Sequence, residues 1–261
     1  MVNPKKSLGQ NFLVDQNILK KICQMVSMSQ KNIIEIGAGT GNLSEYILLK
    51  NPKSLTLIEK DKSLCNILEK KFLKIDKVNV INYDILKLNL EKVTLENSII
   101  IGNLPYNIST QILLKTISFQ KWPPKYEKII FMFQKEVAER INAKKNTSNY
   151  GRLSIITNFR LKIENFFNVS RNCFFPKPKI DSTVVLFKPF IKQNSNINHL
   201  KNLEKITQVF FSNKRKMINK PLKKIFKDYK NIAKKLKLSL NVRPAELEKK
   251  IYYDLAKLIF D

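Results

Sequence analysis

Residues 99–107 read IIIGNLPYN and decide the fold of the chain. The front of this stretch is a β-branched run followed by glycine, which is typical of a strand buried on both faces. Pro105 cannot continue a central strand, and it pushes Leu104 toward an extended backbone. A rigid polar corner therefore follows a buried strand at its carboxyl end, where open α/β sheets bind their ligands.

The polar atoms of this corner suit a particular kind of ligand, the exocyclic amine of adenine. The lone pair of that amine is delocalised into the ring, so the amine is a poor nucleophile. Two acceptors, the Asn103 side-chain oxygen and the Leu104 carbonyl, would draw the lone pair out of conjugation, and the Tyr106 ring could stack on the base. On these residues alone, an ordinary turn between strand and loop stays an equal alternative.

Polar groups or glycine follow four successive predicted strands, over 32–36, 55–58, 78–83 and 98–101. The groups are Gly37, Glu59, Asp84 and Asn103. Because the carboxyl ends of parallel strands meet at one edge of a sheet, we expect all four to face one crevice.

Each of these groups suits a nucleoside cofactor without phosphates. The glycine turn that includes Gly37 lets a ligand approach the backbone, Glu59 could bind a ribose diol, and Asp84 could accept from an adenine amine. Asn42 stands where the dinucleotide-binding fingerprint needs its third glycine. Two alternatives remain open: Glu59 could be a solvated charge, and Asp84 a turn residue or helix cap.

The remaining pattern predicts an α/β fold, a Rossmann-like, mostly parallel sheet with helices on both faces. Residues 5–13 form an expected unstructured basic arm, and Asp15 caps an expected helix over 16–28. Further expected helices cover 42–50, 61–73, 110–118 and 135–141, and further expected strands 128–133, 153–159 and 182–187.

The character of the sequence changes after Pro189. Residues 193–196 read as a linker, and beyond them apolar residues recur at helical spacing, as at Leu247, Ile251 and Leu255. We therefore expect two domains, residues 1–189 with the sheet and residues 190–261 as a small all-helical domain.

The charge of the chain points to a polyanionic partner. The 261 residues carry a net charge of +27. Residues 190–261 hold 18 Lys and Arg against 6 Asp and Glu, whereas residues 1–189 hold 30 against 15. The tail is about twice as densely positive, which favours a nucleic-acid surface that extends into it.

Other features of the composition exclude several classes of protein. No apolar run approaches the roughly 20 residues that cross a bilayer, and the start lacks the apolar stretch of a secretory signal. The three cysteines are far apart, and His199 is the only histidine. These counts argue against a disulfide framework, a His-based triad and a metal site, and we expect a cytoplasmic protein.

A second stretch suited to contact with bases is FFPKPK at residues 174–179. Its prolines stiffen the loop, the ring of Phe174 could stack on a base, and Lys177 and Lys179 could meet phosphate. The alternative is a hydrophobic plug over the edge of the sheet.

Taken in order along the chain, several motifs resemble the ribosomal RNA adenine dimethyltransferase family, in its bacterial small-subunit (KsgA-type) branch. They are GQNFL at 9–13, EIGAGTG at 35–41, GNLPYNIST at 102–110, QKEVA at 134–138, YGRLS at 150–154 and FFPKPKIDS at 174–182. The likeness covers nearly the whole chain. It implies dimethylation, by S-adenosylmethionine, of two adjacent adenosines in a hairpin near the 3′ end of 16S rRNA, and a monomer without metal.

The resemblance also implies roles for individual residues. Cofactor contacts would come from Asn11, Leu13, Gly37, Gly39, Glu59, Asp84 and Asn103. Leu104 would share the acceptor corner with Asn103, and Tyr106 and Phe174 would flank the target base. RNA contacts would come from Lys177, Lys179, Lys214, Arg215, Lys216 and Arg243.

Two departures from the family pattern leave this interpretation standing. Ala38 and Thr40 replace the proline and leucine common in the glycine turn, and Lys177 replaces an apolar residue or proline. Three alternatives stay open: a large-subunit adenine methylase, a non-enzymatic assembly factor on the same fold, and an NAD-dependent oxidoreductase. Residues 150–154 argue against the large-subunit methylase. The intact corner argues against the assembly factor, and Asn42 argues against the oxidoreductase.

Overall fold

The computed structural model describes residues 4–5, 8–191 and 196–259. The chain divides into two compact units. The first contains residues 1–138 and 161–191, and the second contains residues 139–160 and 192–261.

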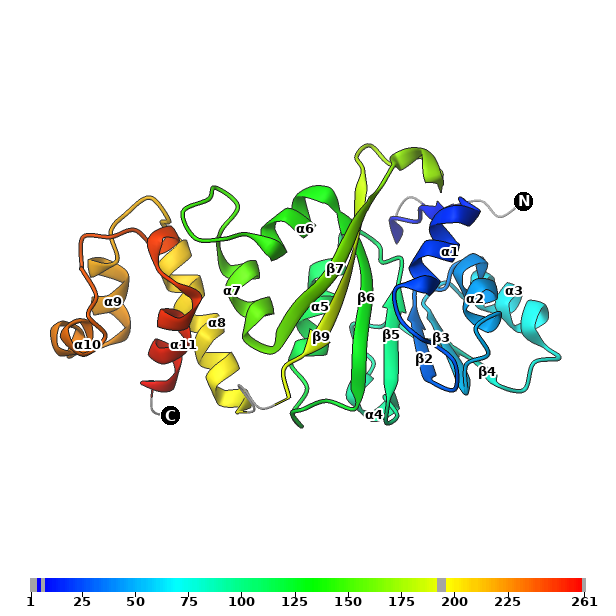
Figure 1. Cartoon of the computed structure of the whole chain (residues 1–261), viewed down its shortest axis with the longest axis horizontal. Coiled ribbons are helices and arrows are strands. Elements are labelled where there is room, and N and C mark those ends of the chain that lie inside the picture. The colour runs from blue at the N-terminus through cyan, green and yellow to red at the C-terminus, as the bar shows by residue number, and fades with distance from the viewer. Residues whose placement is uncertain (1–3, 6–7, 192–195, 260–261) are drawn as a thin grey trace. The chain divides into compact units, whose positions relative to one another are not determined.

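A seven-stranded sheet forms the centre of the first unit (Figure 1). Its order is β4-β3-β2-β5-β6-β9-β7, where β2 to β6 pair in parallel and β9 runs antiparallel to both β6 and β7. The strands are β2 (Asn32–Ile36), β3 (Ser54–Glu59), β4 (Val78–Asn82), β5 (Ser98–Gly102), β6 (Tyr126–Gln134), β7 (Leu161–Val169) and β9 (Ser182–Pro189). The predicted α/β fold with a mostly parallel sheet is confirmed.

Apolar side chains explain why the central strands are where they are. All five residues of β5 are buried, and in β2 only Asn32 is partly exposed. Ile33, Leu55 and Ile99 sit at matching registers of β2, β3 and β5 and belong to one core cluster with apolar residues of α1, α2 and α3. This cluster fixes the sheet, so the strands end at a common edge.

Helices connect most of these strands. The helices of the first unit are α1 (Gln16–Gln24), α2 (Asn42–Leu48), α3 (Lys62–Phe72), α4 (Leu90–Val93) and α5 (Ser109–Ile117), and α6 (Lys135–Asn142) spans the boundary between the units. Asp15 caps α1 as predicted, since its Oδ1 accepts from the Asn17 and Ile18 amides at 2.9 and 3.0 Å.

The N-terminal arm differs from the expectation of an unstructured segment. Phe12–Leu13 form β1, which pairs antiparallel with β8 (Phe174–Phe175). This pairing joins segments about 160 residues apart, so no local pattern could have predicted it. The arm is therefore an ordered part of the first unit where it is described.

A second prediction was wrong for residues 153–159, which lie within the helix α7 (Arg152–Arg160) and not in a strand. The helix buries residues that point in different directions, among them Ile155, Ile156, Thr157 and Phe159. A helix that is buried on all sides shows no apolar stripe, so its sequence resembles a buried strand. The strand β7, which follows it, was missed.

The second unit is helical. Besides α7 it contains α8 (Ile197–Phe211), α9 (Asn219–Ile225), α10 (Tyr229–Lys235) and α11 (Lys249–Lys257). The Tyr150 hydroxyl donates to the Leu247 carbonyl at 2.9 Å, and the Tyr253 hydroxyl to that of Ile155 at 3.2 Å. These contacts tie residues 139–160 to the C-terminal helices.

The expected domain division therefore needs a correction. The break near Pro189 lies close to that of the structure, but residues 139–160 belong to the second unit and not to the first. The physical reason is the burial of α7 among C-terminal helices. Most of the expected linker at 193–196 lies outside the described residues.

Candidate active site

A pocket in the first unit opens at the carboxyl ends of β2, β3, β4 and β5. Gly37, Glu59, Asp84 and Asn103, the four groups expected to converge there, all line it. The N-terminal arm forms a further part of its wall, from Leu8 to Leu13. The crevice predicted from the strand ends is therefore present.

The turn after β2 brings backbone into the pocket. The backbone φ angle is positive at three glycines of this turn, a region that other residues rarely adopt. It is 72° at Gly37, 59° at Gly39 and 79° at Gly41. The Gly37 amide donates to the Ile58 carbonyl at 2.8 Å. A Cβ on Gly39 would lie 3.1 Å from the Phe12 ring, so this glycine also lets the arm approach.

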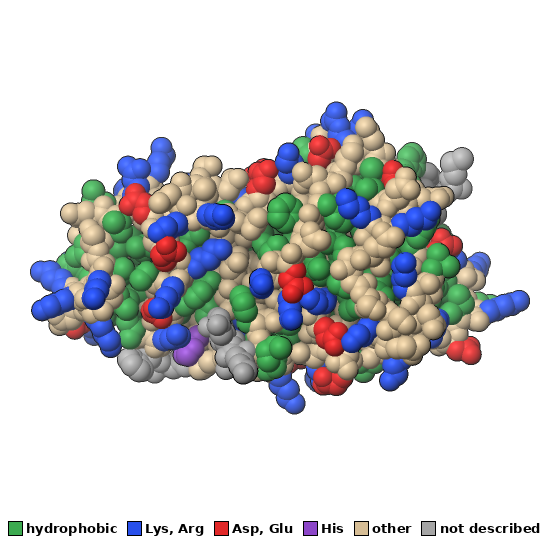
Figure 2. Space-filling view, in the orientation of Figure 1, with side chains coloured by type: hydrophobic (Ala, Val, Ile, Leu, Met, Phe, Trp, Pro, Cys, Tyr) green, Lys and Arg blue, Asp and Glu red, His purple; other side chains and the backbone are tan. Residues whose placement is uncertain are grey.

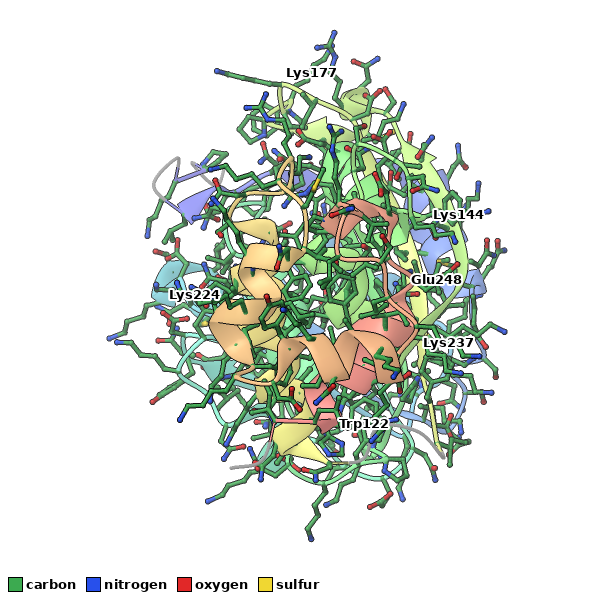
Figure 3. All side chains as sticks on the ribbon, turned by 90° about the vertical axis from the view of Figure 1, so that its left-hand side faces the viewer. Trp122, Lys144, Lys177, Lys224, Lys237 and Glu248 are labelled. Carbon is green, nitrogen blue, oxygen red and sulfur yellow. The ribbon has the colours of Figure 1, made fainter. Side chains whose placement is uncertain are left out.

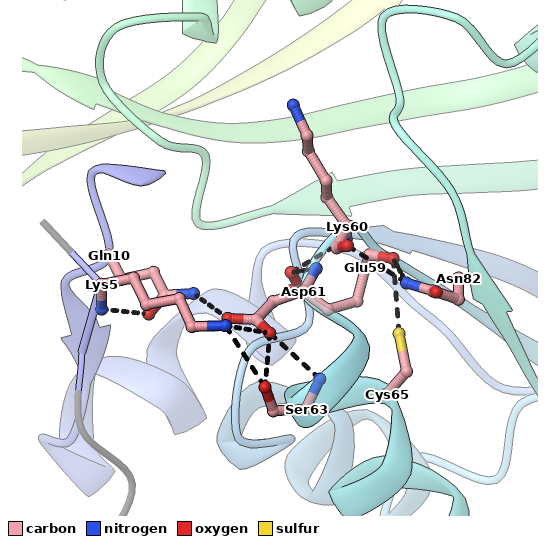
Figure 4. Close-up of polar contacts among 8 residues, drawn as sticks. All are labelled: Lys5, Gln10, Glu59, Lys60, Asp61, Ser63, Cys65 and Asn82. Carbon is pink, nitrogen blue, oxygen red and sulfur yellow. Dashed lines mark hydrogen bonds and ion pairs between the residues drawn. The ribbon is translucent and has the colours of Figure 1, made fainter. Parts of the chain in front are cut away.

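Glu59 is the most firmly held carboxylate of the pocket. Its Oε2 accepts from the Gly39 amide at 3.0 Å, and its Oε1 accepts from the Lys60 and Asp61 amides at 2.9 Å each. The side chain of Asn82 donates to the Glu59 carbonyl at 3.1 Å (Figure 4). Glu59 is only 8% exposed, so it is a buried acceptor at the strand end and not the solvated charge of the alternative.

Asp84 lines the pocket and also makes the hydrogen bond of a turn residue, the alternative that the sequence left open. Its Oδ1 accepts from the Leu86 amide at 2.9 Å, as a turn residue would, and its Oδ2 pairs with Lys60 Nζ at 2.9 Å. The bond from Lys60 is the main cause of its lowered pKa. A ligand amine would meet an ionised carboxylate here.

The acceptor corner is held in a fixed geometry around Asn103. Asn103 Nδ2 donates to the Asn11 carbonyl at 3.0 Å, which leaves its Oδ1 as the acceptor of the amide. A Cβ on Gly102 would lie 2.6 Å from the Ile36 carbonyl, so only glycine allows β5 to approach β2 this closely at the corner. The side chain of Leu104 is buried and anchors the backbone that carries its carbonyl.

Tyr106 lines the pocket next to this corner. Its hydroxyl is 2.6 Å from the Ser182 hydroxyl at the start of β9. Burial raises the pKa of the phenol, and the bond to Ser182 opposes that shift. The ring is thus fixed at both ends, by the backbone of the corner and by β9.

Phe174 does not take the place expected of it. It is 4% exposed, pairs with Leu13 and belongs to the core cluster, outside the lining of the pocket. Its neighbour Phe175 is 59% exposed. The burial of Phe174 fits the alternative of a hydrophobic plug, because a ring that stacks on a base needs an open face.

Asn11 and Leu13 both contact the pocket through the arm. The Leu13 carbonyl accepts from Asn42 Nδ2 at 2.9 Å. Asn42 thus holds the arm in place, a role that its spacing in the glycine turn could not reveal.

Glu35 is another residue of the pocket that the sequence analysis missed. It is buried, and burial raises the pKa of its carboxyl to about 8, while the bond from the Ser44 hydroxyl at 2.6 Å opposes that rise. The sequence analysis missed it because Glu35 stands among the isoleucines of β2, which only indicate a buried strand.

The residues predicted to contact RNA are exposed in both units. Lys177 and Lys179 lie in the loop after β8, and Lys177 extends away from the protein (Figure 3). Lys214, Arg215 and Lys216 follow α8. Arg243 precedes the turn at Pro244–Glu246.

Further exposed lysines, which the sequence analysis did not single out, lie on α9 and α10, where Lys and Arg side chains gather on the face shown in Figure 2. They are Lys220, Lys223, Lys224, Lys230, Lys234 and Lys235.

The chain matches the family model described as ribosomal RNA adenine dimethylase over residues 1–261. It belongs to the ribosomal RNA adenine dimethylase family. Curated relatives named "Ribosomal RNA small subunit methyltransferase A" include one from Pelagibacter ubique, 44% identical over 98% of this chain and 97% of that protein. Another, from Mycoplasma mobile, is 38% identical over 96% of each.

A solved structure supports the same assignment. The dimethyladenosine transferase from Plasmodium falciparum is 28% identical and superposes with a TM-score of 0.77, over 94% of this chain and 95% of that one. The 23S rRNA methyltransferase ErmE, at 22% identity and a TM-score of 0.69, shares the fold.

Two features are absent from the described residues of the dimethylase. None of its described helices is both long and apolar enough to cross a membrane. No group of three or more His, Cys, Asp and Glu side chains in this part of the chain could hold a metal ion.

Proposed function

We propose that the protein transfers methyl groups from S-adenosylmethionine to the N6 amines of two adjacent adenosines, in a hairpin near the 3′ end of small-subunit (16S) rRNA, two methyl groups to each. Membership of the adenine dimethylase family and the names of the 44% and 38% identical relatives support this substrate. The observation that carries the proposal is that the Asn103 corner lines the same pocket as Gly37, Glu59 and Asp84.

The residues of the pocket fit this cofactor. Glu59 is a buried carboxylate at the end of β3, suited to a ribose diol, and Asp84 is an acceptor suited to an adenine amine. The turn at Gly37 and Gly39 brings backbone to the pocket wall, where it could contact the methionine part. When bound, S-adenosylmethionine supplies an electrophilic methyl group, which is chemistry that the protein lacks.

The acceptor corner would then act on the target amine. In the first transfer, Asn103 Oδ1 and the Leu104 carbonyl accept from its two hydrogens, which frees the nitrogen lone pair for attack and stabilises the positive charge that develops on the nitrogen. In the second transfer, one of the two oxygens accepts from the single hydrogen that remains. The released proton passes to water, so no strong base is needed. This agrees with a sequence whose only histidine is His199.

The target base must leave its stack to reach the pocket, which costs a few kcal/mol. The ring of Tyr106, fixed by Ser182, is a wall on which the base can stack. Since Phe174 is buried, a second aromatic wall would have to come from a rearranged loop or from the exposed Phe175.

The exposed cations supply affinity for the rRNA, which carries one charge per phosphate. Lys177 and Lys179 in the first unit, and Lys214, Arg215, Lys216 and Arg243 in the second, would contact phosphates. We further propose that the enzyme acts as a monomer, in the cytoplasm where bacterial ribosomes are assembled.

Methylation in vitro tests this function. Purified protein, labelled S-adenosylmethionine and either small or large ribosomal subunits that lack dimethyladenosine are incubated together, and the labelled nucleotides are mapped. We expect N6-dimethyladenosine at two adjacent positions near the 3′ end of the small-subunit rRNA. Label in the large-subunit rRNA alone would contradict the proposal.

A further inference from the structure

Asp61 carries more hydrogen bonds than a helix cap needs, and the proposed chemistry uses none of them (Figure 4). Its Oδ1 caps α3 by accepting from the Ser63 amide at 3.0 Å. The same carboxylate accepts from two residues of the N-terminal arm, Lys5 Nζ at 2.8 Å and Gln10 Nε2 at 3.1 Å. Its side chain is only 3% exposed.

These contacts hold the carboxylate in its ionised form. Burial alone would raise the pKa of Asp61, but the hydrogen bonds from Lys5, Ser63 and Gln10 outweigh it and lower the pKa to about 2. Lys5 is further tied to Gln10, whose Oε1 accepts from the Lys5 amide at 2.7 Å. Asp61 therefore holds two residues of the arm that are also bonded to each other, not a single side chain.

The arm beyond this point forms a wall of the pocket. Residues 8–13 line it, and the Asn11 carbonyl receives the hydrogen bond that orients Asn103. The far end of the arm is held by the β1–β8 pairing and by Asn42. The wall is thus fastened at two points, on either side of Asn11.

The two fastenings differ in strength. The far end is made of backbone pairing and buried side chains, with Leu13 4% exposed. The near end depends on side-chain bonds to Asp61, and the Lys5 side chain that makes the ion pair is 49% exposed, so water can reach it. The near end is therefore the one that can open without breaking backbone pairing.

The near end is also joined directly to the predicted ribose-binding carboxylate. The Asp61 amide donates to Glu59 Oε1 at 2.9 Å, so the turn at residues 59–61 presents one carboxylate to the pocket and the other to the arm. A shift of the arm at Asp61 therefore acts on the turn that holds Glu59.

We propose that Asp61 is a positioning residue, which latches the N-terminal arm over the bound cofactor through Lys5 and Gln10. Opening of this latch admits S-adenosylmethionine and releases the spent cofactor, which must happen between successive methyl transfers. The inference rests on the proposed function, since it takes the pocket to be the cofactor site.

Variants on the arm test the latch without touching the α3 cap. In Lys5→Met and Gln10→Met, we expect the dissociation constants of S-adenosylmethionine and S-adenosylhomocysteine to rise by about three- to tenfold, and dissociation of the latter to accelerate as much. Calorimetry measures the first and stopped-flow fluorescence the second. In Lys5→Met, whose side chain lies outside the pocket lining, kcat at saturating cofactor should stay near that of the wild type, so the effect falls on KM.

Two controls separate a latch from a purely structural role. Asp61→Asn keeps a good helix cap but loses the charge, and it should reproduce the effect of Lys5→Met, with no further loss when the two are combined. Lys31→Met removes another ion pair of 2.8 Å, to Glu127, outside the pocket lining, and should leave cofactor binding unchanged.

The outcomes are distinct. Unchanged affinity and dissociation rates in Lys5→Met, Gln10→Met and Asp61→Asn, with a wild type that binds the cofactor, would overturn the latch and leave the proposed function intact. A wild type that binds neither S-adenosylmethionine nor its product would overturn the proposed function, and the latch with it.

Discussion

The pocket of the first unit and the basic surface of the second use charge in opposite ways. The pocket gathers acids that are buried or fixed by backbone amides, as Glu59 is by three of them. The surface of the second unit carries exposed cations, such as Lys214 and Arg215, on long side chains. A site for chemistry needs atoms in fixed positions, whereas a surface for a polyanion needs only density of charge.

This comparison predicts that single changes in the pocket have large and specific effects, while changes on the basic surface act weakly and together. The largest effect should follow from Asn103→Ala. It removes one of the two proposed acceptors, so we expect methyl transfer to slow by about 10²- to 10³-fold. This is the size of loss known for removal of one preorganised hydrogen-bonding group, such as an oxyanion-hole donor. Single-turnover assays on small ribosomal subunits measure it.

The control for this variant is cofactor and RNA binding. Asn103 also donates to the Asn11 carbonyl, so a modest loss of cofactor affinity is compatible with its assigned role. Normal turnover by Asn103→Ala would remove the residue from the chemistry.

On the basic surface, charge reversal at Lys214, Arg215 and Lys216 together should weaken rRNA affinity by about tenfold or more at low salt and flatten its salt dependence. Binding titrations at several salt concentrations measure both. The affinity for S-adenosylmethionine should not change. A salt dependence equal to that of the wild type would show that these cations do not contact the RNA.

A third change tests how tightly the corner is packed. Gly102→Ala places a Cβ 2.6 Å from the Ile36 carbonyl and 2.7 Å from the Leu104 side chain, so we expect the free energy of unfolding to fall by about 1–3 kcal/mol. Gly151→Ala is the matched control, because its Cβ would meet only ordinary contacts at 3.7 Å. Chemical denaturation compares the two, and equal stabilities would argue against the close approach at Gly102.

The last change concerns the pH dependence of stability due to Glu35, whose pKa is raised to about 8 by burial from an ordinary value of 4.5. Between these values the unfolded chain has lost the proton that the folded chain keeps, so this residue lowers stability as the pH rises from about 4.5 to 8. Glu35→Gln should remove that contribution. Thermal unfolding from pH 5 to pH 8 measures it, and parallel curves for the two proteins would contradict the assignment.

The two regions also differ in how far the sequence predicts them. The central strands β2, β3 and β5 follow from apolar runs buried on both faces, and their end residues then converge by the geometry of a parallel sheet. The sequence fails for α7, whose burial on all sides hides the helical period. It also fails for β7, which is largely exposed along its length and contains a register shift between Ile163 and Asn165.

What the sequence cannot predict are contacts between distant segments. The hydroxyl bond from Tyr106 to Ser182, the bond from Asn42 to Leu13 and the latch at Asp61 each join residues brought together only by the fold. Their side chains are common polar types without a spacing signal. Phe174 shows the reverse case, since its motif suggests a contact with a base, while the β1–β8 pairing buries it.

The most direct test of the account is the chemical state of the rRNA in cells. Small-subunit rRNA is isolated from cells that lack this protein and carry either the wild-type chain or Asn103→Ala, and its 3′ fragment is analysed by mass spectrometry. The account predicts two adjacent N6-dimethyladenosines with the wild type and unmodified adenosines with the variant. Two dimethyladenosines with both proteins, or with neither, would contradict it.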